Sequence, residues 1–126
     1  MVIPLESIEK ARSAVRAALD KKAKDVLVLE LKDLSIMADY FVICSGESTT
    51  HVRSIVDNIE EKLRQESIRP AGVEGYNLSR WVLMDYSDVI VHVFEEETRA
   101  FYELEKLWLD APVIEMEEED LQGHGN

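Results

Sequence analysis

Apolar residues recur at helical spacing in three segments of the chain. Residues 5–22 carry an apolar side chain every three or four positions and end in two lysines, which suit a helix C-terminus. A second amphipathic segment runs to about Glu66, and Ser48 or Thr49 is suited to cap its first turn. A third begins near Thr98, so we predict three main helices. The last helix would present to the core Phe101, Leu104, Leu107 and Trp108.

Apolar runs between these helices predict β-strands. The run 26–31 is almost continuously apolar, which is typical of an inner strand buried on both faces. Residues 40–45 form a second strand. Glycine and proline residues then mark a loop that holds a short edge strand at 73–74. Two further strands are predicted at 80–86 and 88–94.

Length and order of elements together predict the architecture. A chain of 126 residues has room for one domain. Its helices and strands predict a single α/β domain with a mixed sheet of four to five strands and three main helices. We expect this domain to span residues 1–111. Residues 112–126 contain the run Glu-Met-Glu-Glu-Glu-Asp and predict an acidic, disordered tail.

The segment 81–92 divides into two faces, because side chains alternate along a strand. A turn at Tyr86 and Ser87 would place Val82 opposite Val91 and Met84 opposite Val89, which gives a core face of four apolar residues. The opposite face is apolar around a tryptophan and has an acidic rim. Its members are Trp81, Leu83, Ile90, His92, Asp85 and Asp88.

This second face allows two interpretations. If helices cover only the other side of the sheet, it is an exposed apolar patch of the kind that marks a partner site. If a helix covers it as well, Trp81 is an ordinary core residue. The sequence also leaves the position of the turn undecided, since Tyr-Ser lacks the Asn-Gly or Asp-Gly chemistry of two-residue hairpins. A longer loop can change the register and exchange the two faces.

Charge narrows the class of partner. The chain has 26 Asp and Glu against 14 Lys and Arg, a formal charge of −12. No cluster of Lys and Arg is dense enough for strong direct binding to nucleic acid, whose phosphates this surface repels. A basic protein is the more natural partner, because opposite potentials speed encounter. The alternative is that acidity only aids solubility.

Compartment and membrane contact follow from a few residues. Cys44 is the only cysteine and lies in an apolar run, so we expect a buried structural thiol and no disulfide. The N-terminus lacks the apolar stretch of a signal peptide. No apolar stretch approaches the roughly 20 residues that cross a bilayer. We therefore expect a cytoplasmic protein with no membrane partner.

Catalytic motifs are incomplete. Gly46-Glu47-Ser48, between a strand and a helix, is similar to the Gly-Ser element of nucleotidyltransferases. Those enzymes also need an Asp-x-Asp or Asp-x-Glu pair on a strand to hold two metal ions, and Asp85 and Asp88 stand three apart across a turn. Phosphate-binding glycine motifs are missing, and the histidines lack metal-ligand spacing. We predict no enzyme, no cofactor and no metal.

Three motifs stand out in order along the chain. They are ADYFVICSG at 38–46, WVLMDYSDVIVHVF at 81–94 and RAFYELEKLWLDA at 99–111, with Ser48 and its helix and the segment 72–75 between the first two. Together they resemble the ribosomal silencing factor, or Iojap, family over about residues 5–111. The resemblance implies a fold related to the nucleotidyltransferases without their catalytic residues.

The resemblance also implies a function. The family binds a basic protein of the large ribosomal subunit, conventionally numbered fourteen, at the face that meets the small subunit. Bound there, it blocks subunit joining sterically and represses translation when nutrients are short. Members are often homodimeric, and a role in maturation of the large subunit is an alternative.

Carried over to this chain, the resemblance implies partner contacts by Trp81, Leu83, Asp85 and Tyr86, and secondarily by Asp39 and Tyr40. Asp85 and Asp88 would pair with Lys or Arg of the partner. Two rivals stay open, a divergent nucleotidyltransferase and an assembly factor that contacts rRNA directly. The tail from Pro112 lies outside the resemblance and receives no function.

Overall fold

The computed structural model describes residues 6–116. Within them the predicted single α/β domain is confirmed, with a five-stranded mixed sheet and three α-helices. The short edge strand is present as well. The elements in chain order are α1 (Ser7–Asp20), β1 (Lys24–Glu30), β2 (Tyr40–Gly46), α2 (Thr49–Gln65), β3 (Gly72–Glu74), β4 (Trp81–Asp85), β5 (Val89–Glu95), α3 (Glu96–Tyr102) and the 3-10 helix η1 (Leu104–Trp108).

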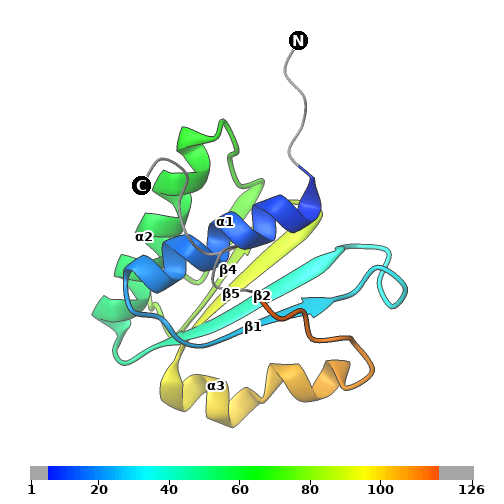
Figure 1. Ribbon diagram of the computed structural model, residues 1–126. Helices are drawn as coiled ribbons and strands as arrows, with labels where there is room; N and C mark the ends of the chain where they lie inside the picture. Colours follow the sequence, from blue (N-terminus) through cyan, green and yellow to red (C-terminus); the bar gives the residue numbers. More distant parts are fainter. Residues whose placement is uncertain (1–5, 117–126) are drawn as a thin grey trace.

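The sheet has the strand order β1-β2-β5-β4-β3. β2 and β5 are parallel, and the other neighbours are antiparallel. Helices α1 and α2 lie against one face of the sheet, whereas α3 and η1 lie on the other (Figure 1). The molecule therefore has three layers, and β4 is separated from the sheet edge by the three residues of β3.

Each face of the sheet has its own hydrophobic cluster. The face beneath α1 and α2 buries the larger one, which includes Val42 of β2 and Ile55 of α2. The face toward α3 and η1 buries a smaller one around Ile43 and Phe94. Cys44 is buried in the larger cluster, where burial raises the pKa of its thiol to about 12. The prediction of a buried thiol is confirmed.

The predicted hairpin turn at Tyr86 and Ser87 is wrong by one position. The backbone N of Tyr86 donates to the O of Val89 at 2.9 Å, so the loop consists of Ser87 and Asp88. Ser87 has a φ of 72°, the left-handed conformation that a two-residue hairpin turn needs. The pairing shifts by two residues, and because side chains alternate with a period of two, the strand residues keep their faces, whereas Asp88 lies in the loop. The core face is confirmed as Val82, Met84, Val89 and Val91.

The predicted last helix is interrupted. Glu103 has a φ of 49° and separates α3 from η1. A 3-10 helix has three residues per turn, so residues beyond the break no longer follow the predicted stripe. Leu104 is buried and Trp108 is half-buried, but Phe101 and Leu107 are 80% and 75% exposed. The prediction that all four face the core is wrong for these two.

The start of the predicted tail is part of the fold. The N of Glu30 donates to the O of Pro112 at 2.9 Å, and the N of Ile114 donates to the O of Val28 at 2.9 Å. Val113 bridges to β1, so residues 112–114 cover the outer edge of that strand. Residues 117–126 of the predicted tail lie outside the described residues, as does the first predicted helical residue, Leu5.

None of the helices within residues 6–116 has the length and apolar character needed to span a membrane.

Candidate functional site

The outer face of the β4–β5 hairpin, which we define as Trp81, Leu83, Asp85 and Ile90, points away from α1 and α2. All four side chains are half-buried. The segment of α3 and η1 packs mainly on side chains of β1, β2 and β5. Trp81 is only partly buried, at the margin of this cluster. The outer face is therefore partly covered. It is neither the fully exposed patch nor the helix-covered core that the sequence allowed.

Trp81 is held rigidly within this face. Its ring stacks on Phe94 with centroids 4.8 Å apart and lies 5.2 Å from the ring of Tyr102. Its Nε1 donates a hydrogen bond to Nδ1 of His92 at 3.0 Å. A tryptophan that is fixed before binding loses little conformational entropy when a partner covers it. The arrangement suits an interface anchor.

His92 fixes the position of Trp81, a role that sequence reasoning missed. It is only 4% exposed, and the ring of Phe41 lies 4.6 Å away. Since Nδ1 accepts a hydrogen bond from Trp81, the imidazole carries its own proton on Nε2, which has no hydrogen-bond partner among the described residues. Burial lowers the pKa of His92 to about 4, so the ring is neutral at physiological pH. No sequence motif signals this pairing, because it depends on the register of two strands.

We expect His92 to make the fold sensitive to acid. The pKa of the imidazole is about 4 in the folded chain and close to 6.5 in the unfolded one. The unfolded chain therefore binds the proton first, and the free energy of unfolding falls as the pH decreases from about 6.5 to about 4. The full loss is about 3 kcal/mol. Above pH 6.5 the residue contributes no pH dependence.

Urea unfolding of wild type and His92→Phe between pH 7.5 and pH 4.5 measures this effect, since every carboxylate is common to both chains. The stability of wild type should fall more steeply than that of the variant. Parallel curves would show that His92 does not titrate in this range.

The two acids predicted at the rim have different roles. Asp85 lies on the outer face, and one of its carboxylate oxygens accepts a hydrogen bond from the N of Ser87 at 2.8 Å. Asp88 instead forms an ion pair of 2.8 Å with Lys10 of α1. Its charge is compensated within the chain, so only Asp85 presents a carboxylate to a partner of the outer face. Asp39 is half-buried, and its N donates to the O of Asp88 at 2.7 Å.

Tyr40 and Tyr86 lie on the opposite face of the sheet from Trp81. They are 4% and 2% exposed and pack in the cluster beneath α1 and α2. Burial raises the pKa of Tyr86, whose hydroxyl has no hydrogen-bond partner among the described residues. Tyr86 precedes the loop and follows the strand register, so its side chain points to the core face and not to the outer face. As folded, neither tyrosine ring is available to a partner.

An apolar loop tip next to the hairpin turn was not predicted. In the loop between β1 and β2, Ile36 is fully exposed and Met37 is 78% exposed. The loop is closed by a 2.7 Å hydrogen bond from the N of Leu31 to the O of Asp39, and Asp39 also ties it to Asp88. Adjacent Ile36 and Met37, with Leu34 nearby at 45% exposure, were the available signal in the sequence.

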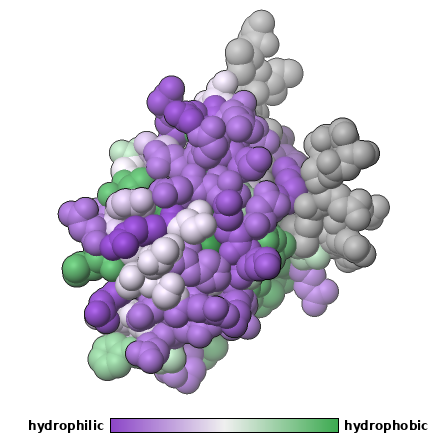
Figure 2. All heavy atoms as spheres, turned by 90° about the vertical axis from the view of Figure 1, so that its left-hand side faces the viewer, coloured by the Kyte–Doolittle hydropathy of each residue, from purple (hydrophilic) through white to green (hydrophobic). Residues whose placement is uncertain are grey.

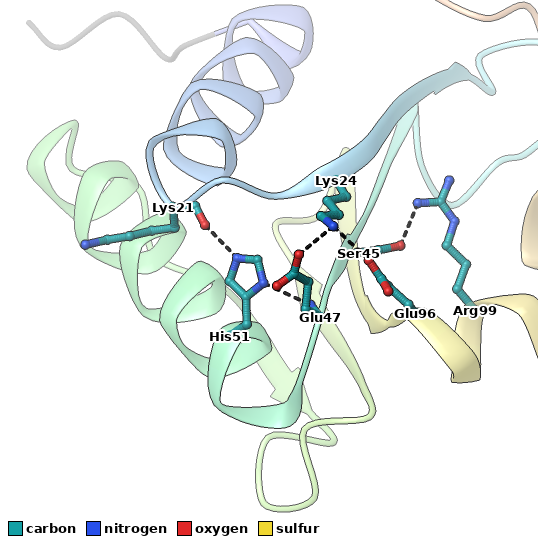
Figure 3. Close-up of polar contacts among 7 residues, drawn as sticks. All are labelled: Lys21, Lys24, Ser45, Glu47, His51, Glu96 and Arg99. Carbon is teal, nitrogen blue, oxygen red and sulfur yellow. Dashed lines mark hydrogen bonds and ion pairs between the residues drawn. The ribbon is translucent and has the colours of Figure 1, made fainter.

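The segment with the Gly-Ser element is occupied by the protein's own polar groups (Figure 3). The hydroxyl of Ser48 caps α2 by accepting from the N of His51 at 3.1 Å. His51 accepts from the N of Glu47 at 2.9 Å, and its other ring nitrogen lies 2.7 Å from the O of Lys21. Lys24 pairs with Glu47 at 2.5 Å, and this contact raises the pKa of Lys24 and lowers that of Glu47. These contacts join α1, β1 and α2, which is a structural role.

Within residues 6–116, no three His, Cys, Asp or Glu side chains are grouped so that they could hold a metal ion.

Comparison with known proteins gives consistent matches. A sequence model of the family described as "Ribosomal silencing factor during starvation" matches residues 4–125, so the match extends beyond residue 111 into the predicted tail. "Ribosomal silencing factor RsfS" of Halalkalibacterium halodurans is 45% identical over 86% of this chain and 93% of its own length. The protein of the same name from Bacillus subtilis is 42% identical over 82% and 88%.

Similarity extends to structure and to a more distant relative. A crystal structure of a protein from Chromobacterium violaceum superposes with a TM-score of 0.81 at 31% identity, covering 82% of this chain and 87% of that one. A mouse protein named "Mitochondrial assembly of ribosomal large subunit protein 1" is 33% identical over 70% of this chain and 40% of its own length.

Proposed function

Since the chain belongs to the ribosomal silencing factor family, we propose that it represses translation by binding the large ribosomal subunit and blocking its union with the small one. The partner is a basic large-subunit protein on the face that meets the small subunit, and the setting is the cytoplasm under nutrient limitation. The mechanism is steric and needs no catalysis. The names of the relatives support silencing, and the basic partner is supported by the charge of this chain.

The observation that carries the proposal is the fixed indole of Trp81 on a half-buried apolar face. Trp81 and Leu83 give a partner an apolar centre, and Asp85 gives it a carboxylate at the rim. Tryptophan is enriched among interface residues whose loss costs most binding energy. An acidic rim favours a partner rich in Lys and Arg and speeds its encounter with the site.

A second candidate function is maturation of the large subunit, which the printed name of the mouse relative favours. The same surface serves both functions if the protein binds the large subunit before the small one arrives. Direct contact with rRNA is disfavoured by the charge of −12. Crosslinking that recovers rRNA instead of a basic protein would support direct contact.

Cosedimentation with purified subunits tests the binding step. We expect the protein to travel with large but not small subunits, and its affinity to fall as salt is raised from about 50 to 200 mM, because charges at the rim are screened. Equal binding to both subunits would contradict the proposal. Release of pyrophosphate from nucleoside triphosphates in the presence of magnesium would instead support the alternative of a nucleotidyltransferase.

A further inference from the structure

A groove lies beside the outer face, between the loop before β4 and helix α3. Its volume is about 460 Å³, in the range of sites that accept a ligand or a large side chain. Apolar walls come from Leu78 in the loop, Trp81 at the start of β4, and Phe101 and Tyr102 of α3. The face in Figure 2 is mainly hydrophilic, and apolar side chains gather there in small patches.

The aromatic rings of the groove form a continuous series from core to surface. Phe94 is fully buried and stacks on Trp81, Trp81 lies 5.2 Å from Tyr102, and Tyr102 lies 5.0 Å from Phe101. Exposure rises along the series, to 54% for Tyr102 and 80% for Phe101. A partner that covered the ring of Phe101 would extend the hydrophobic cluster around Phe94.

Helix α3 leaves its aromatic residues uncovered in this chain. It has seven residues and none is buried, and a helix of this length depends on tertiary contacts for stability. Besides the ring contact of Tyr102 with Trp81, these contacts come from Arg99, which donates to Glu105 at 3.0 Å, to the O of Asp25 at 2.7 Å and to Ser45 at 2.9 Å. With α3 held in this way, Phe101 is free to contact another molecule.

Charge distinguishes the possible occupants of the groove. Glu95 and Glu97 stand at its rim with Arg80 as the one cation among the lining residues. A second copy of this chain would bring another −12 to an acidic rim. A segment with an apolar side chain flanked by Lys or Arg meets both the apolar wall and the carboxylates.

We propose that the groove receives an apolar side chain, flanked by basic residues, from the same basic large-subunit protein that contacts the outer face. The inference rests on the proposed function. It is supported by Trp81, which belongs to both the outer face and the groove, so that one partner reaches both without a gap. The groove thus extends the partner site from the β-hairpin onto α3.

Affinity for purified large subunits tests this extension in three variants. Leu78→Ser and Phe101→Ser each remove an apolar side chain that is 74% or 80% exposed, so the fold should keep its melting temperature. We expect each to weaken binding about tenfold or more. The control is Leu19→Ser on α1, a 39% exposed leucine on the other side of the sheet, which should bind like wild type.

Leu83→Asp, at the centre of the outer face, separates the two proposals. If it weakens binding while both groove variants bind like wild type, the groove inference is overturned and the proposed function stands. If neither Leu83→Asp nor either groove variant weakens binding, the assigned surface itself is wrong. If the groove variants lower self-association in sedimentation velocity and leave subunit binding unchanged, the occupant is a second copy, which also overturns the inference.

Discussion

Replacing Leu83 by aspartate should weaken binding to large ribosomal subunits by about thirtyfold or more, which corresponds to roughly 2 kcal/mol. Leu83 is half-buried in the middle of the outer face, beside the fixed indole of Trp81 on the same strand. An aspartate there would have to lose its water when a partner covers it, without a matching cation at the apolar centre. Because Leu83 is not among the buried core residues, the folded chain should tolerate the change.

Trp81→Ala is a less specific test than Leu83→Asp. The indole stacks on Phe94 and is hydrogen-bonded to His92, so its removal would also lower the stability of the free protein. The matched control for Leu83→Asp is Gln65→Asp, which adds the same charge at an exposed position of α2. Cosedimentation of Leu83→Asp at the level of this control would remove the outer face from the partner site.

Gly75→Ala should destabilise the fold by about 3 kcal/mol, because two costs add. Gly75 has a φ of 83°, a conformation that residues with a Cβ rarely adopt. A Cβ at this position would stand 2.2 Å from the O of Trp81, a backbone atom that cannot move aside easily. The substitution therefore pushes on the strand that carries Trp81, and binding to large subunits should fall with stability.

Gly72→Ala is the matched control, since a Cβ there meets no atom within 4 Å and its φ is ordinary. Urea unfolding at neutral pH should place this variant within about 1 kcal/mol of wild type, in the range of changes at exposed sites. If Gly75→Ala unfolds at the same urea concentration as Gly72→Ala, the loop before β4 is more adaptable than the structure indicates.

Local pattern was sufficient to predict most of the fold. The apolar spacing of α1 and α2 and the apolar runs of β1, β2 and β5 appear at their predicted positions in the sequence. The prediction of an inner strand is wrong for β1, which lies at the edge of the sheet. The two faces of the β4–β5 hairpin were also predicted, although the turn was misplaced. The error shifted the pairing by an even number of residues, and a face assignment by alternation survives such a shift.

The failures concern features that depend on contacts distant in sequence. Apolar spacing continues through Glu103, so the break between α3 and η1 is invisible to periodicity. The ion pair of Asp88 with Lys10 joins residues far apart in the chain. The resemblance implied a partner contact by Tyr86, but the strand register places its ring in the core.

The proposed mechanism requires that the bound protein keeps the two subunits apart. Light scattering of purified large and small subunits, mixed with and without the protein, measures their joining directly. We predict that wild type, preincubated with large subunits, prevents the rise in scattering, and that Leu83→Asp at the same concentration allows it. Normal joining with wild type still bound to the large subunit would contradict the proposed function.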